Sequence, residues 1–287
     1  MGELITRIGG LLGGLVIVTW LALTAAPLFD GDRGVPGPFL LLGGVGEAVG
    51  ALVLVGLLVA VSLLVCRAIN TAVGLFVLGC GLGVFAMRSG TLLDVVFSGA
   101  APASAALETI LWSVPVGAAS WALFRFGGPF ADVHSDRPGL ASALEPRAIV
   151  ACAAALAALP VAWVILRNPT KGQVLAAALL GGVVTGLLGR IWSPRTQPVL
   201  LAAAPVVAIG AAQFYLSTRV GSPLRALAAG DLPRLLWMTP IDVASGSLVG
   251  VALGLGWARS FIKDGSEVHD AVPVGASLRR DLGGSLR

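Results

Sequence analysis

The sequence has little charge. Only 12% of its 287 residues are Asp, Glu, Lys or Arg, roughly half the fraction of a typical soluble domain, whereas 56% are hydrophobic. A chain of this composition has too few charged side chains to cover a surface that faces water, which excludes a soluble globular protein. The composition predicts an all-α integral membrane protein whose surroundings are the lipid bilayer.

The sequence is also poor in the side chains that carry much membrane-bound chemistry. Its two histidines, His134 and His269, lie outside the apolar runs, which excludes a haem held by paired histidines within the membrane. Its two lysines, Lys171 and Lys263, stand at the ends of apolar runs, so we expect no retinal-type Schiff base inside the bilayer. No HExxH motif, P-loop or serine nucleophile with a nearby histidine occurs. We therefore predict a protein that is not an enzyme and has no cofactor.

Cysteine pairs and clusters of positive charge are also absent from the sequence, which further restricts the possible classes of protein. The three cysteines lie singly in apolar runs without a CxxC pair, which predicts small core residues and neither disulfides nor a metal cluster. The net charge of +4 comes from basic residues scattered between apolar runs, and this scatter predicts no nucleic-acid partner. Arg88, Arg125, Arg190 and Arg259 each end an apolar run, and we interpret them as anchors that reach the lipid headgroups.

What the sequence has in abundance is long apolar runs. A membrane-spanning helix needs about 20 mostly apolar residues. Runs that meet or approach this length predict a polytopic integral membrane protein, a bundle of about eight transmembrane helices joined by short loops. The predicted spans are residues 8–26, 46–66, 69–87, 104–124, 148–166, 174–188, 199–216 and 241–262.

Positive charge is distributed unevenly between the two sides of this topology. With both termini in the cytoplasm, twelve of the 19 Arg and Lys residues are inside, as the positive-inside rule favours. We predict a bundle over residues 1–262 and a polar cytoplasmic tail over 263–287, in the inner (cell) membrane of a bacterium. In segment 218–240, Ser222 and Asp231 are predicted helix caps, with Pro223 and Pro233 in the first turns of short helices that lie along the outer interface.

Four carboxylates lie in or beside the predicted spans. Glu47, Glu108 and Asp242 fall in the first turns of three helices and Asp94 between two spans, so all four share the outer face. One interpretation is electrostatic, because an acid at a helix N-terminus gains about 0.3–1 kcal/mol from the helix dipole. The other is a cation or proton site open to the outer face, with Glu47 and Glu108 as its foremost members and Gln213 as a neutral ligand.

Glycines four residues apart recur in the spans. This spacing puts small residues on one helix face and lets two helix backbones approach closely. We interpret it first as packing within the chain and second as a docking face for a partner helix. The last span has a double repeat, at Gly246, Gly250 and Gly254, and the first span has two interleaved pairs, Gly9 with Gly13 and Gly10 with Gly14.

A short internal echo pairs GAASWAL at residues 117–123 with GAAQFYL at residues 210–216. It would match spans two to four with spans five to seven, and two tandem units of three helices must be inverted relative to each other, as in many transporters. Proline also occurs inside three spans, at Pro115, Pro160 and Pro205, where it predicts kinks.

Two functions remain open. The missing catalytic chemistry, the small-residue faces and the short loops favour a non-catalytic subunit that packs with and stabilises the helices of other membrane protein subunits. The outer acids, the glycine-rich spans and the echo favour the alternative, a small-molecule or ion/proton-coupled permease with an acidic site open to the outer face. The sequence leans to the subunit, because a transporter commonly has polar groups near the midplane and these spans have few.

Overall fold

The structure is a computed structural model, and it describes residues 2–29, 40–41, 43–97, 99–128 and 144–262. The predicted tail, 263–287, lies outside these ranges, and no strand occurs within them. Eight helical segments are long and apolar enough to cross a membrane, which confirms the fold prediction, and their ends differ from the predicted ends by at most four residues. The spans are Leu4–Phe29, Val45–Ala68, Thr71–Arg88, Pro102–Gly127, Pro146–Ile165, Lys171–Trp192, Val199–Ser217 and Pro240–Ala258.

Four of the spans are uninterrupted α-helices, and two others end in a differently wound turn. The uninterrupted spans are α2 (Val45–Ala68), α3 (Thr71–Arg88), α9 (Lys171–Trp192) and α12 (Pro240–Ala258). In the first span α1 (Gly2–Ala25) continues into the 3₁₀ turn η1 (Ala26–Phe29). In the fourth span α5 (Pro102–Ala122) continues into the π-helical turn η2 (Leu123–Gly127).

The fifth span is interrupted near its middle. It consists of α7 (Pro146–Cys152), the 3₁₀ segment η3 (Ala153–Ala157) and α8 (Ala158–Ile165). Pro160 lies just beyond η3. Because proline has no N–H group and its ring clashes with the carbonyl four residues earlier, here that of Leu156, regular α-helical bonding fails in this stretch.

The seventh span also begins irregularly. It consists of the 3₁₀ turn η4 (Val199–Ala202) and α10 (Ala204–Ser217), and Pro205 stands in the first turn of α10. A proline at this position lacks an N–H that would have no helical partner anyway. Pro115, by contrast, is accommodated inside α5 without a change of helix type.

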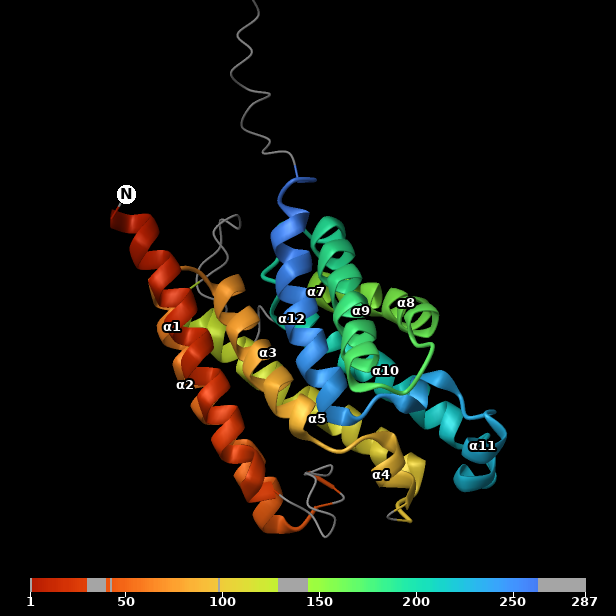
Figure 1. Cartoon of the computed structure of the whole chain (residues 1–287). Helices are drawn as coiled ribbons and strands as arrows, with labels where there is room; N and C mark the ends of the chain where they lie inside the picture. The colour runs from red at the N-terminus through yellow and green to blue at the C-terminus, as the bar shows by residue number, and fades with distance from the viewer. Residues whose placement is uncertain (1, 30–39, 42, 98, 129–143, 263–287) are drawn as a thin grey trace, which may run out of the picture.

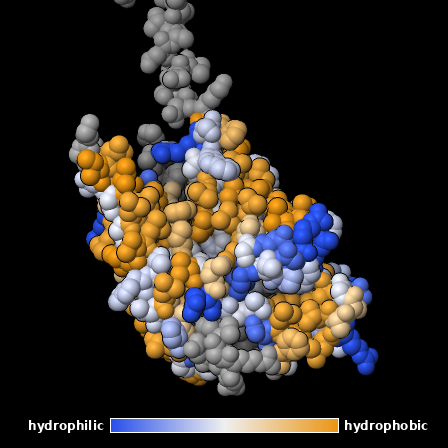
Figure 2. Space-filling view, viewed as in Figure 1, coloured by the Kyte–Doolittle hydropathy of each residue, from blue (hydrophilic) through white to orange (hydrophobic). Residues whose placement is uncertain are grey.

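The eighth span lies at the centre of the bundle. α12 packs mainly against α9 and α3, while α5 and α10 pack against each other behind it (Figure 1). α12 is the most enclosed span, with 78% of it buried inside the chain, and the first span is the least, with 22%. The exposed face of α1 therefore meets lipid, and Figure 2 shows hydrophobic side chains over much of this side of the molecule.

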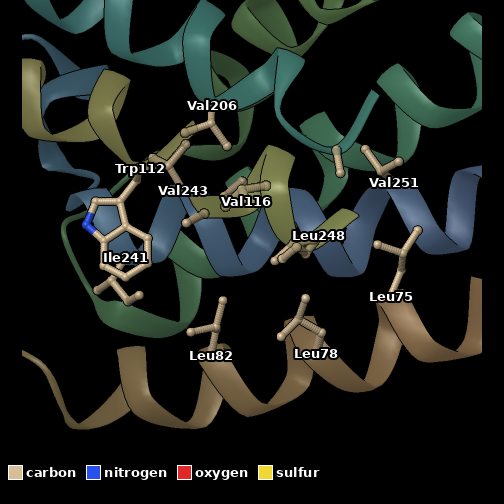
Figure 3. Close-up of a cluster of buried hydrophobic side chains, with 14 of the residues drawn as sticks. Leu75, Leu78, Leu82, Trp112, Val116, Val206, Ile241, Val243, Leu248 and Val251 are labelled. Atoms are coloured by element: carbon tan, nitrogen blue, oxygen red, sulfur yellow. The ribbon is translucent and has the colours of Figure 1, made fainter. Parts of the chain in front are cut away.

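Apolar side chains from four helices fill the middle of the bundle (Figure 3). Each labelled side chain is at most 4% exposed. They are Leu75, Leu78 and Leu82 of α3, Trp112 and Val116 of α5, Val206 of α10, and Ile241, Val243, Leu248 and Val251 of α12. Lipid tails are as apolar as leucine, so close packing, more than exclusion of water, stabilises such a core. Cys66 is buried and Cys80 and Cys152 are half-buried, and all three are free thiols.

Glycine lets α9 and α12 approach closely. Gly246, Gly250 and Gly254 all face α9, and a Cβ atom added to any of them would collide with the α9 backbone. In return, a Cβ atom on Gly182 or Gly186 of α9 would collide with the α12 backbone. The structure thus places the double repeat at an interface within the chain, where no partner helix has access to it.

The two parts of the internal echo lie on neighbouring antiparallel helices. A Cβ atom on Gly117 of α5 would touch Ala203, just before α10, and one on Gly210 of α10 would crowd Ile110 of α5. Any two antiparallel helices that pack together contact each other at two such positions. In this pair, glycine occupies both positions, and each glycine belongs to one part of the echo. α3 and α9 also run in opposite directions, on either side of α12 (Figure 1).

Short helices stand at the ends of the spans. They include α4 (Leu92–Phe97), α11 (Pro223–Ala229) and the 3₁₀ turn η5 (Arg234–Trp237). Ser222 caps α11 with its hydroxyl, as predicted. The start of η5 has no side-chain cap, so the prediction that Asp231 caps a helix there is wrong.

Arg190 does not act as an anchor at the membrane surface. Its side chain is 1% exposed, and its guanidinium group donates to the carbonyl oxygen of Thr196 at 3.0 Å. The anchor interpretation is wrong for this residue because the chain that follows α9 turns back and accepts its hydrogen bond. Arg88 and Arg259 are exposed, as an anchor requires.

Candidate functional site

Three helix ends meet at a polar cluster, called the rim cluster below. It consists of Ser89, which follows α3, Lys171, which begins α9, and Thr239 and Asp242 at the start of α12. The Lys171 ammonium group donates to both carboxylate oxygens of Asp242, at 2.9 and 3.1 Å. It also donates to the hydroxyls of Ser89 at 3.1 Å and Thr239 at 3.5 Å. One ammonium group therefore links α9 to the ends of both neighbouring helices.

The start of α12 holds the Asp242 carboxylate in place. Thr239 is the N-cap, Pro240 is the first helical residue, and Asp242 is the third, which forms a capping box. Asp242 Oδ2 accepts hydrogen bonds from the Thr239 backbone N–H at 3.1 Å and from Thr239 Oγ1 at 2.6 Å. These bonds form within four consecutive residues, so the carboxylate is positioned by local structure, independently of Lys171.

The ion pair is enclosed although it stands at helix ends. The Asp242 side chain is 1% exposed and the Lys171 side chain 13%. Removing two charges from water is costly, and their attraction offsets that cost only where the geometry is close and further hydrogen bonds are made. The capping bonds from Thr239 and the Ser89 hydroxyl supply those further bonds.

Asp94 adds a second negative charge near Lys171. It lies in the first turn of α4, where its Oδ2 accepts from the Thr91 backbone N–H at 2.7 Å and from Thr91 Oγ1 at 2.9 Å. Its charge attracts the Lys171 ammonium group. Of the four predicted acids, Asp242 pairs directly with Lys171, and Asp94 adds a weaker attraction without a hydrogen bond to it among the described residues.

Glu108 and Glu47 lie at the same end of the bundle but outside the rim cluster. Glu108 is fully buried and accepts hydrogen bonds from the backbone N–H groups of Leu40 at 3.1 Å and Leu41 at 3.3 Å. Glu47 is half-buried in the first turn of α2. The position of Glu47 favours the electrostatic interpretation. Glu108 is the seventh residue of α5, so its expected place in the first turns of a helix is wrong, and its carboxylate binds the backbone of residues 40 and 41 instead. No group of three or more His, Cys, Asp and Glu side chains that could hold a metal ion occurs in the described part of the chain.

Gln213 supports the segment that leads into the rim cluster. It lies on α10 and is 2% exposed. Its Nε2 group donates to the carbonyl oxygens of Leu235 at 2.9 Å and Met238 at 2.8 Å. Because Met238 directly precedes Thr239, Gln213 fixes the chain one residue before the helix cap.

Sequence alone did not identify Lys171 as the partner of Asp242. The two residues are 71 positions apart, and nothing near Lys171 in the sequence marks the contact. One signal was present, because the chain has two lysines against seventeen arginines. A lysine ammonium group is compact and has three donors, which suits acceptors arranged around it on different helices.

The rim cluster is an enclosed ion pair whose ammonium group also donates to two hydroxyls at the ends of neighbouring helices. No protein-family model, curated protein or solved structure matches this chain. Its function is therefore inferred from the geometry of the cluster.

Proposed function

We propose that this integral membrane protein is a permease for a small monovalent cation, coupled to protons, with the Lys171–Asp242 pair as its coupling site. The supporting observation is a two-oxygen ion pair enclosed where three spans meet. Ionisable groups inside membrane bundles commonly mark ion and proton paths. The adjoining cavity, which Thr239 and Gln213 help to line, has a volume of about 10 Å³ and fits a water-sized particle better than an organic cargo.

Coupling would follow from competition for one carboxylate. While Asp242 is ionised and free of other cations, it holds Lys171 and joins α9 to α12 at this end of the bundle. A proton or a metal cation at Asp242 removes the counter-charge of the ammonium group and weakens that connection. Because the proton and the cation exclude each other from the same carboxylate, binding of one on each side of the membrane gives exchange.

One feature of the fold supports this function. The fifth span contains the 3₁₀ segment η3, and interrupted helices are common in transporter folds. The internal echo between residues 117–123 and 210–216 predicts a second feature, an inverted repeat of spans two to four and five to seven. The proposal keeps the predicted location in a bacterial inner membrane with both termini in the cytoplasm.

Proteoliposomes with a trapped pH-sensitive dye would test the proposal. In vesicles with an imposed pH gradient, we expect external Na⁺ or K⁺ to collapse the gradient when the wild-type protein is present. Asp242→Asn keeps the size and one capping acceptor but removes the charge, so it should abolish the effect. Glu47→Gln removes an acid at the same end of the bundle and serves as the matched control, with activity retained. Wild-type vesicles that behave like protein-free vesicles, or full activity in Asp242→Asn, would reject the proposal.

One observation favours a second function, that of a non-catalytic subunit. Of the two interleaved glycine pairs of α1, Gly10 and Gly14 face side chains of this chain. A Cβ atom on Gly9 or Gly13 would meet nothing within 4 Å among the described residues. An uncovered pair of this spacing suits close packing with a partner membrane helix.

Purification in a mild detergent would test the second function. We expect a stoichiometric membrane protein to co-purify with the wild type and to be lost when Gly9→Leu and Gly13→Leu are combined. Gly256→Leu is the control, because Gly256 also has open space where a Cβ atom would be, but on α12. Recovery of the wild type as a stable protein on its own would count against this function.

A further inference from the structure

The side-chain carbonyl of Gln213 lies in a buried environment without a protein donor. The two acceptors of its Nε2 group are main-chain carbonyl oxygens, of Leu235 and Met238. Carbonyl oxygens cannot donate, so the amide group cannot be flipped, and Oε1 must lie on the other side of the amide group. There Oε1 is buried and has no hydrogen-bond partner among the residues that the structure describes.

Gln213 lines a small cavity between α4, α5, α10 and the start of α12. The cavity has a volume of about 10 Å³, close to what one water molecule needs. Most of its wall is apolar, and Pro102 and Pro240 in the wall have no N–H group to offer. The polar side chains in the wall are those of Gln213 and Thr239.

We infer that one water molecule is bound in this cavity and donates a hydrogen bond to Gln213 Oε1. Thr239 Oγ1 already donates to Asp242 at 2.6 Å and accepts from Lys171 Nζ at 3.5 Å and from the Asp242 backbone N–H, so the partner of the water is Gln213. An anion is excluded, because Oε1 requires a donor. Ions such as Ca²⁺ require six or more oxygen ligands, more than this wall offers. The presence of the water does not depend on the proposed transport function.

A pair of substitutions of equal shape tests the inference. Ala106 is 1% exposed and lines the cavity. Ala106→Thr and Ala106→Val would both displace the water, but only the threonine hydroxyl can donate to Gln213 Oε1. We expect the threonine variant to unfold at a temperature higher than the valine variant by about 2–4 °C in detergent. Equal midpoints, or a higher one for valine, would overturn the inference.

The same pair at a second position controls for the intrinsic effect of the two side chains. Ala119 is buried on the same helix and is not part of the cavity wall. Ala119→Thr should be no more stable than Ala119→Val, because Ala119 does not line the cavity that Gln213 lines. A threonine advantage of equal size at both positions would also overturn the inference.

A direct measurement on the wild-type protein remains decisive if the Ala106 variants do not fold. The chain has three glutamines, so ¹⁵N-glutamine labelling gives three side-chain amide groups, and Gln213→Met assigns one of them. We expect magnetisation to pass from water to the Gln213 amide group about as readily as to that of half-exposed Gln173. No transfer to Gln213 would overturn the inference. Neither experiment measures transport, so failure here is separable from failure of the permease proposal.

Discussion

Replacing Lys171 by methionine removes the ammonium group, keeps a side chain of similar length, and so isolates the contribution of the ion pair. At an effective dielectric constant of about 20, unit charges 2.9 Å apart attract each other by about 5–6 kcal/mol. Desolvation offsets part of this attraction, and loss of one partner from a buried pair commonly costs about 3–5 kcal/mol. We expect Lys171→Met to lower the free energy of unfolding by about 3 kcal/mol, because Asp242 keeps both capping hydrogen bonds from Thr239.

A double-mutant cycle measures this interaction. Asp242→Asn should lower the free energy of unfolding less than Lys171→Met does, because asparagine still accepts from Thr239 and the Lys171 side chain is 13% exposed. The double variant should be little worse than Lys171→Met, which gives a coupling free energy of about 2–3 kcal/mol. In detergent, Lys171→Met should lower the midpoint temperature of thermal unfolding by about 6–12 °C. A coupling free energy below about 0.5 kcal/mol would mean that the two residues contribute independently, and would refute the reasoning.

Three further predictions concern packing, loop attachment and sidedness. Gly250→Ala should destabilise the protein by about 1–3 kcal/mol, measured by thermal unfolding, because the new methyl group would collide with the α9 backbone, whereas Gly256→Ala should be near neutral. Glu108→Leu removes the acceptor of two backbone N–H groups and should lower the free energy of unfolding by about 2–4 kcal/mol. Glu108→Gln keeps one acceptor oxygen and should lower it less. Equal decreases for the two variants in thermal unfolding would contradict this prediction. In a cysteine-free background, Asp231→Cys and Ser260→Cys should react with an impermeant thiol reagent from opposite sides of the membrane, the former from outside.

The spans were predictable because each depends on a local property. About 20 consecutive apolar residues suffice to identify a membrane helix, and the charges and prolines at its ends mark where it stops. The interruption of the fifth span was predictable in kind from Pro160, since the clash of proline with the preceding turn is also local. The burial of Arg190 was not, because it depends on a turn that the sequence does not mark.

The candidate site was only half predictable. Asp242 could be placed at a helix start, and the Thr239-Pro240 pair before it is an ordinary helix-initiating sequence. Lys171 becomes its partner only because α9 packs against α12. The glycine spacing favours close packing of helices, but it does not determine which helices pair. Helix pairing also decides the partners of Glu108. The sequence analysis grouped Glu108 with the other acids, whereas in the structure its carboxylate accepts hydrogen bonds from the backbone N–H groups of Leu40 and Leu41.

The central position of α12 has a consequence for biosynthesis. The seven other spans precede α12 along the chain, so α3 and α9 enter the membrane before the helix that separates them exists. Until α12 is made, the glycines of α3 and α9 that pack against it have no partner helix, and the lysine at the start of α9 has no Asp242 to pair with. Nascent chains that stall before residue 240 should therefore be recognised by quality-control proteases as unfinished.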